Sequence, residues 1–204
     1  ESVAKIEHYP DVRCEALREA ISRFEQVNME EILCGNGAAE LFFAAVQAVW
    51  PQKALVIAPS FSEYEEALRS VGAEIEYYYL CEEDNFQIRE DYVDKLSEEI
   101  DMIFLCNPNN PTGQTIDRDM LIKILNRCKK QNIVVILDEC FLEFLDEPNR
   151  YEMSDLRGEY PNLLIIKAFT KIFSMPGLRL GYAISSNQDI LEEMSWKLQQ
   201  WNVS

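Results

Sequence analysis

Residues 163–182 of this 204-residue chain have the sequence LLIIKAFTKIFSMPGLRLGY. The run Leu163–Ile166 is entirely apolar, which predicts a buried strand, and Thr170 and Lys171 follow it almost at once. Arg179 comes eight residues after Lys171 and precedes another short apolar run. A hydroxyl, an amine and a guanidinium group are therefore expected close together where a buried strand ends.

Those three side chains have the chemistry of a binding site for pyridoxal 5′-phosphate (PLP). The amine of Lys171 can condense with an aldehyde to form a Schiff base, and the Thr170 hydroxyl and the Arg179 guanidinium suit a phosphate group. A surface lysine and arginine on either side of a turn would give the same local pattern, because charged side chains are mostly exposed. The choice between the two interpretations depends on the rest of the chain.

Apolar runs and amphipathic helices alternate along the whole sequence. The runs that predict strands are residues 54–58, 75–80, 102–106, 133–137, 163–166 and 180–184. Helical spacing is found over residues 13–26, 38–50, 62–71, 90–99 and 117–131, and again from residue 189. Strands that are apolar throughout are typical of a sheet covered by helices on both faces. The pattern therefore predicts one α/β domain, a three-layer sandwich with a mostly parallel central sheet.

Polar side chains follow two more of the predicted strands, at the edge where such a sheet binds its ligands. The strand 102–106 runs into residues 107–113, NPNNPTG, whose prolines and glycine predict a tight loop that presents amide groups. Asp138 follows the strand 133–137, where a carboxylate is costly unless it has a partner. A protonated pyridine nitrogen would be such a partner, and a structural ion pair is the alternative.

Two further segments suit a phosphate and a planar ring. Residues 34–40, CGNGAAE, lead into the predicted helix 38–50, so backbone amides and the helix dipole can attract an anion there. A GxG pattern by itself usually marks an ordinary loop. Phe61 follows the strand 54–58 and can stack on a planar ring, although a phenylalanine is more often part of a core.

Composition limits the classes of protein and site. The formal net charge is −17, which argues against nucleic acid or an anionic membrane as a partner, and no apolar run is long enough to span a bilayer. The six cysteines show no metal-binding spacing, and several lie in apolar runs; free, reduced thiols indicate the cytoplasm. His8 is the only histidine, so we expect neither a histidine-based triad nor a metal site.

In this order, the segments resemble the fold-type I PLP-dependent enzymes, and specifically the class I and II aminotransferases. The resemblance runs from about Tyr9 to Tyr182 and rests on three patterns together, NPNNPTG, DExF and TKxFxxxGLRLGY. Within that family the chain is similar to histidinol-phosphate aminotransferases and threonine-phosphate decarboxylases. The resemblance implies the large domain of a PLP-dependent transferase, with PLP as its cofactor.

The resemblance also implies a role for each matching residue. Lys171 would carry the Schiff base and act as general acid and base, and Asp138 would pair with the pyridine nitrogen. Asn110 would donate a hydrogen bond to the ring hydroxyl, and Phe61 would stack on the ring. The phosphate would be held by Gly37, Ala38, Ala39, Thr170 and Arg179.

Three positions carry further implications. Tyr9 resembles the tyrosine that reaches the phosphate of the neighbouring subunit, which implies a homodimer with shared active sites. Phe141 stands where aminotransferases usually have a tyrosine that contacts the ring hydroxyl, and a phenylalanine there is closer to the decarboxylase branch. Ala38 replaces a commoner polar residue, which removes one side-chain contact to the phosphate.

The expected domain and activity follow from the same resemblance. Relatives are longer, so residues 1–204 are expected to be the PLP-binding large domain, truncated at both ends and without the C-terminal small domain that grips the substrate carboxylate. The implied activity is transfer of an amino group from an amino acid to a 2-oxo acid through a Schiff base on Lys171.

Three alternatives remain open. One is PLP-dependent decarboxylation of a phosphorylated amino acid, which Phe141 slightly favours. Another is an inactive fragment that serves in dimerisation or ligand binding. The last is a nucleotide-binding α/β domain, although the chain lacks both a GxGxxG pattern after its first strand and a GKS/T loop.

Overall fold

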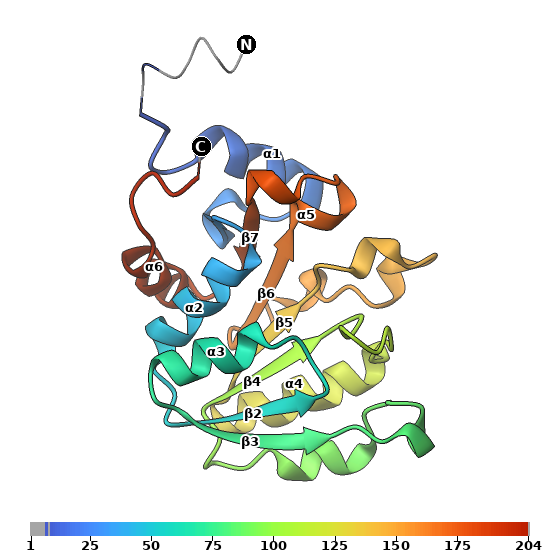
Figure 1. Ribbon diagram of the computed structural model, residues 1–204. Helices are drawn as coiled ribbons and strands as arrows, with labels where there is room; N and C mark the ends of the chain where they lie inside the picture. The colour runs from blue at the N-terminus through green and yellow to red at the C-terminus, as the bar shows by residue number, and fades with distance from the viewer. Residues whose placement is uncertain (1–6, 8, 204) are drawn as a thin grey trace.

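The computed structural model describes Glu7 and residues 9–203, in which short strands alternate with helices (Figure 1). The strands are β1 (Ile32–Gly35), β2 (Lys53–Ala58), β3 (Glu74–Tyr79), β4 (Met102–Cys106), β5 (Val134–Asp138), β6 (Leu163–Ala168) and β7 (Gly181–Ile184). The α-helices are α1 (Glu15–Glu25), α2 (Ala38–Val49), α3 (Glu63–Ser70), α4 (Arg118–Gln131), α5 (Phe169–Ile172) and α6 (Gln188–Lys197). Short 3-10 helices lie in the connections, at Met29–Glu31, Glu82–Asp84, Glu90–Lys95, Leu142–Phe144, Pro148–Arg150, Ser154–Leu156 and Pro176–Leu178.

The strands form one seven-stranded sheet in the order β1-β7-β6-β5-β4-β2-β3. From β6 to β3 each neighbouring pair is parallel, whereas β7 is antiparallel to both of its neighbours. Parallel neighbours need long crossover connections, and the helices supply several of them. The sheet is therefore mostly parallel, as the sequence predicts.

Side chains of the central strands point alternately into two hydrophobic cores. Along β4, Met102 and Phe104 belong to the core shared with α2, α3 and α6, whereas Ile103 and Leu105 belong to the core shared with α1 and α4. Figure 1 shows α2 and α3 lying together over one face of the sheet. Every residue of β4 is buried, which is why its sequence is apolar throughout. The predicted three-layer α/β sandwich is confirmed.

Two local predictions differ from the structure. The strand β1 was not expected, because four residues are too few to show a strand pattern in the sequence. The predicted helix over residues 90–99 is wrong, since only Glu90–Lys95 is helical and it is a 3-10 helix. Tyr92 and Leu96 have helical spacing and are buried, but the acidic residues 98, 99 and 101 would stand at the carboxyl end of a longer helix, where its dipole repels negative charge.

All six cysteines are free, and those at 34, 106, 128 and 140 are buried, as expected. Across residues 7 and 9–203, no helix has both the length and the apolar character that crossing a membrane would require.

Candidate active site

Residues far apart in the sequence meet at one edge of the sheet because of its register. The parallel strands β4, β5 and β6 end next to one another, with Cys106 opposite Asp138 and Asp138 opposite Ile166. The antiparallel strand β7 begins at this same edge, since Gly181 pairs with both Ala168 and Gly35. The loop before α2, the end of β5 and the segment after β6 are thereby brought together.

A cavity of about 140 Å³ lies at this edge. Its lining residues are Ala38, Ala39, Phe42, Phe61, Asn110, Asp138, Cys140, Phe141, Ala168, Thr170, Lys171 and Arg179. Nine of the eleven sequence-predicted site residues are in this set, and the two outside it are Gly37 and Tyr9. The structure therefore gathers an amine, a carboxylate, an amide, a hydroxyl, a guanidinium and aromatic rings around one space.

Glycines shape one wall of the cavity, at the N-terminus of α2. Gly37, which precedes α2, has a φ of 88°, and a Cβ atom there would lie 2.8 Å from Nη2 of Arg179. A Cβ atom on Gly181 would lie 2.8 Å from the backbone nitrogen of Ala38. The guanidinium and the first amides of α2 thus converge only because both side chains are absent, which forms a cradle suited to an anion.

Asp138, the last residue of β5, is buried but has hydrogen-bond partners. The Tyr64 hydroxyl donates to its Oδ2 at 2.5 Å, and the Cys140 backbone nitrogen donates to its Oδ1 at 2.9 Å. Burial raises the pKa of Asp138, while these hydrogen bonds and the charge of Lys171 act in the opposite direction. Asp138 thus lines the cavity, and these two hydrogen bonds fix the position of its carboxylate.

Sequence reasoning missed Tyr64. The residue lies on α3, fully buried, with its ring stacked on Phe104 at a centroid distance of 4.8 Å. Burial and the neighbouring charge of Asp138 raise the pKa of Tyr64 well above its usual value, so its hydroxyl stays protonated and donates. Its nearness to Phe61 in the sequence was the available signal, and the two rings are in edge-to-face contact with their centroids 5.7 Å apart.

The loop 107–113 divides its asparagines between structure and site. The Asn107 side chain accepts a hydrogen bond from the backbone of Ile116, which closes the base of the loop. The Asn109 side chain donates to the backbone oxygen of Pro59 at 3.1 Å and so ties the loop to the segment that carries Phe61. Only Asn110 lines the cavity.

Lys171 stands on the short helix α5 and lines the cavity. Its Nζ lies 5.3 Å from the centre of the Phe141 ring, so its cation faces an aromatic surface. Phe141 has no hydroxyl and cannot donate a hydrogen bond here. This part of the site is therefore less polar than a tyrosine would make it.

A buried ion cluster lies beside the site residues. Nζ of Lys167 is 2.9 Å from Glu25, 3.1 Å from Glu152 and 3.7 Å from both Glu139 and Glu143. Burial raises the pKa of Glu139 to about 8, against the opposing charge of Lys167. Four carboxylates surround one lysine, so the negative charges of Glu152 and Glu25 add to the effect of burial and favour a protonated Glu139.

Tyr9 does not line the cavity. Its side chain is 81% exposed, and its ring lies 4.8 Å from the ring of Trp201. The predicted contact with a neighbouring subunit therefore stays a prediction. His8 lies outside the described residues.

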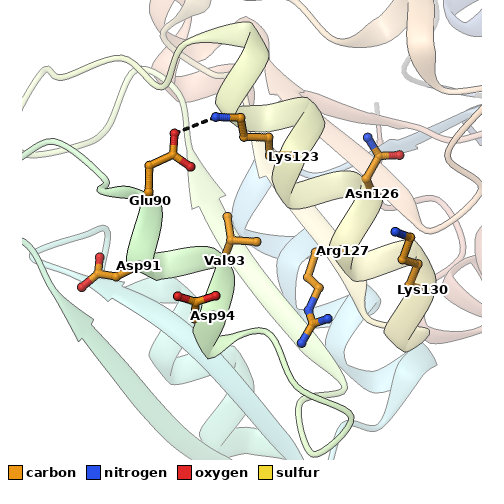
Figure 2. A pocket seen from close by; sticks show the side chains of 8 residues that line it. All are labelled: Glu90, Asp91, Val93, Asp94, Lys123, Asn126, Arg127 and Lys130. Carbon is orange, nitrogen blue, oxygen red and sulfur yellow. Dashed lines mark hydrogen bonds and ion pairs between the residues drawn. The ribbon is translucent and has the colours of Figure 1, made fainter.

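A second hollow, of about 610 Å³, lies between the Glu90–Lys95 segment and α4 (Figure 2). Acidic side chains come from one side and basic side chains from the other, and Glu90 pairs with Lys123 at 2.6 Å. It contains none of the predicted site residues. The charges there balance one another across an exposed surface, so we place the functional site at the sheet edge.

The cavity at the sheet edge fits PLP. Its carboxylate suits a pyridine nitrogen, Phe61 offers a flat face, and the glycine cradle with Arg179 and Thr170 suits a phosphate. Lys171 is the amine that lines the same cavity. Each functional group of the cofactor thus has a chemically matching partner.

Comparison with known proteins gives matches over nearly the whole chain. The family described as aminotransferase class I and II matches residues 2–204. The threonine-phosphate decarboxylase of Salmonella typhimurium is 36% identical over 98% of this chain and 54% of its own length. The histidinol-phosphate aminotransferase of Ruminiclostridium cellulolyticum is 35% identical over 88% of this chain and 50% of its own length.

A solved structure agrees with the sequence comparisons. The histidinol-phosphate aminotransferase from Clostridium acetobutylicum superimposes with a TM-score of 0.91 at 33% identity, covering 100% of this chain and 59% of that chain. The chain spans about half the length of the curated relatives it matches.

Proposed function

Because the chain belongs to the class I and II aminotransferases, a PLP-dependent family, we propose that it is the cofactor-binding part of an enzyme acting on the Cα atom of an amino acid. The observation that carries the proposal is the single cavity that Asp138, Asn110, Lys171 and Arg179 line together. We propose that residues 1–204 form the PLP-binding large domain of that enzyme.

The proposed roles of the residues follow from their places around the cavity. Arg179, Thr170 and the amides at the start of α2 would hold the phosphate, and Asp138 would hold the pyridine nitrogen. Phe61 would lie against the ring, and Asn110 would donate to the ring hydroxyl. When bound, PLP supplies an electron sink next to the Cα atom of the substrate.

The chain's own side chains would manage charge and protons at that centre. The Asp138 carboxylate, backed by Tyr64, would favour a positively charged ring nitrogen, which strengthens electron withdrawal from Cα. Lys171 would accept a proton and return it to the substrate as general base and general acid. Burial of Asp138 in a low-dielectric setting makes its interaction with a cation stronger than it would be in water.

Two reactions at Cα are candidates, and a specific observation supports each. Decarboxylation of a phosphorylated amino acid is supported by Phe141 and by the relative named threonine-phosphate decarboxylase. Transamination, the reaction first expected from the sequence, is supported by the family description and by the relatives named histidinol-phosphate aminotransferase. The proposed substrates are amino acids as small molecules and, for transamination, 2-oxo acids as well.

We also propose a homodimer with shared active sites, located in the cytoplasm. Tyr9 and Trp201 are aromatic, exposed and in contact with each other, and Trp196 is 75% exposed. A pair of exposed aromatic side chains such as Tyr9 and Trp201 is consistent with a surface that meets a partner.

The test uses the full-length protein loaded with PLP and two substrates in parallel. With threonine phosphate carrying a labelled carboxyl group, decarboxylation releases labelled carbon dioxide. With histidinol phosphate and a 2-oxo acid, transamination produces the new amino acid without such release. The matched control is Lys171→Ala, and turnover of neither substrate above this control would contradict the proposal.

A further inference from the structure

One carboxylate joins the glycine cradle to a segment far along the chain. Glu40 is half-buried in the first turn of α2. Its Oε2 accepts a hydrogen bond from the backbone nitrogen of Asn36 at 2.6 Å and another from Nδ2 of Asn202, also at 2.6 Å. Asn202 lies 162 residues after Glu40, so two distant segments meet at one oxygen atom.

The contact with Asn36 leaves the start of α2 free for an anion. A glutamate in the first turn of a helix commonly reaches back to the backbone nitrogen of the N-cap residue. Glu40 instead binds Asn36, the residue before the N-cap, Gly37. Gly37, Ala38 and Ala39 carry no polar side chain that could bond with the first amides of α2. The loop is therefore fixed while these amides stay available to a phosphate.

Glu40 also packs closely against the loop that it binds. A Cβ atom on Gly35 would lie 3.2 Å from Oε2 of Glu40 and 2.8 Å from the side chain of Leu41. The backbone nitrogen of Gly37 donates to the backbone oxygen of Gly35 at 2.9 Å, so the loop forms a tight turn around Asn36. The position of Gly37, which lies beside Arg179 in the cradle, therefore depends on how Asn36 is held.

The second partner of Glu40 belongs to a segment that is fixed on both sides of it. Val203 is buried in the core that includes Ile32 of β1, and the ring of Trp201 contacts the ring of Tyr9. Asn202 lies between these two anchored residues. Through Asn202, the segment 201–203 thus holds the Glu40 carboxylate in place.

We propose that Glu40 is a positioning residue for the cofactor phosphate, a role that rests on the proposed binding of PLP in this cavity. The carboxylate holds Asn36 so that Gly37 and the first amides of α2 keep the arrangement that Arg179 completes. Its negative charge repels an anion in the cradle, so what positions the loop is an oxygen that accepts two hydrogen bonds. Glutamine offers such an oxygen without the charge, whereas alanine offers neither.

The test compares the affinities of the full-length protein for PLP and for pyridoxal, which lacks the phosphate group, in equilibrium dialysis. In Glu40→Ala the affinity for PLP should fall by about tenfold, because a hydrogen bond to a charged group is lost, and the affinity for pyridoxal should stay unchanged. Glu40→Gln should bind PLP at least as tightly as the wild-type protein. The matched control is Asp189→Ala, which removes an exposed acid from the first turn of α6 and should change neither affinity.

Three results would overturn the role of Glu40. One is an unchanged affinity of Glu40→Ala for PLP, and another is an equal loss for PLP and pyridoxal, which would indicate general damage to the cavity. The third is a loss in Glu40→Gln as large as in Glu40→Ala, since the charge and not the oxygen would then matter.

Hydrogen exchange supplies a measurement that needs neither a variant nor bound PLP. Asn36 is exposed, yet its backbone amide should exchange slowly in the wild-type protein because Glu40 accepts its hydrogen bond. Exchange at the rate of an unstructured amide would contradict the role of Glu40, whether or not Glu40→Ala folds. A wild-type protein that takes up no PLP would contradict the proposed function itself, whereas normal uptake in all variants would contradict the role of Glu40 alone.

Discussion

Gly181→Ala places a methyl group where the structure has no room for one. The added Cβ atom would lie 2.8 Å from the backbone nitrogen of Ala38, 2.9 Å from the backbone carbon of Gly37 and 3.1 Å from the backbone oxygen of Lys167. All three are backbone atoms, so none can rotate away. Restoring an ordinary contact of 3.4 Å requires the start of α2 and β7 to separate by about 0.6 Å.

The cost of that separation divides between stability and cofactor binding. Overpacking of this kind costs about 1–3 kcal/mol. If the fold absorbs the clash, the free energy of unfolding falls by that amount. If the cradle opens instead, PLP affinity falls by about tenfold for each 1.4 kcal/mol. We therefore expect the two losses together to amount to about 1–3 kcal/mol.

The assay compares Gly181→Ala with Gly158→Ala. Gly158 is exposed, and a Cβ atom there would meet no atom within 4 Å, so its replacement is a matched control. Urea unfolding gives the stability of each variant, and titration with PLP gives its affinity. The reasoning is refuted if Gly181→Ala equals Gly158→Ala in both measurements.

Three further substitutions test other parts of the site. Tyr64→Phe removes the hydroxyl that stabilises ionised Asp138, so the pKa of Asp138 should rise further. The free energy of unfolding, measured with urea, should fall by about 1.5–3 kcal/mol at pH 8 and by less at pH 5. An equal loss at the two pH values would contradict this. Glu139 has a folded-state pKa of about 8, above its ordinary 4.5, so its contribution to stability is complete below pH 4.5 and is lost as pH rises to 8, at up to about 1.4 kcal/mol per pH unit. Glu139→Gln should flatten that slope, and a slope unchanged from wild type would show that Glu139 does not hold the proton. Arg179→Gln should weaken PLP binding in equilibrium dialysis by about ten- to a hundredfold. Arg179→Lys should recover part of the affinity, because lysine keeps the positive charge but cannot make the two parallel hydrogen bonds of a guanidinium. Equal affinity in the wild-type protein and both variants would exclude a contact between Arg179 and the phosphate.

The sheet and most of the cavity were predictable because their signals are local. An apolar run such as Met102–Cys106 reports burial on both faces, and residues that follow such runs in a parallel sheet meet at one edge. Asp138, Lys171 and the loop that carries Asn110 were found in that way, whereas the choice of Asn110 within the loop came from the family resemblance. Strand direction was not predictable, because the same pattern fits β7 in either orientation.

Contacts between distant segments were beyond the reach of local patterns. Tyr64 and Asp138 are 74 residues apart, and the sequence around either residue gives no sign that the two side chains are in contact. The same holds for Lys167 and Glu25, 142 residues apart, whose pairing only the fold reveals. The glycine cradle is a similar case, since the pattern shows that Gly37 and Gly181 are small but not what they approach.

The central claim is that Lys171 is the amine that holds PLP in this cavity. The most direct measurement is reduction of the PLP-treated full-length protein with borohydride, followed by peptide mapping of the modified lysines. We expect one reduced adduct, on Lys171, and an absorbance band of a protein-bound Schiff base that is absent from Lys171→Ala. Adducts spread over surface lysines, or a single adduct on another lysine such as Lys167, would contradict the account.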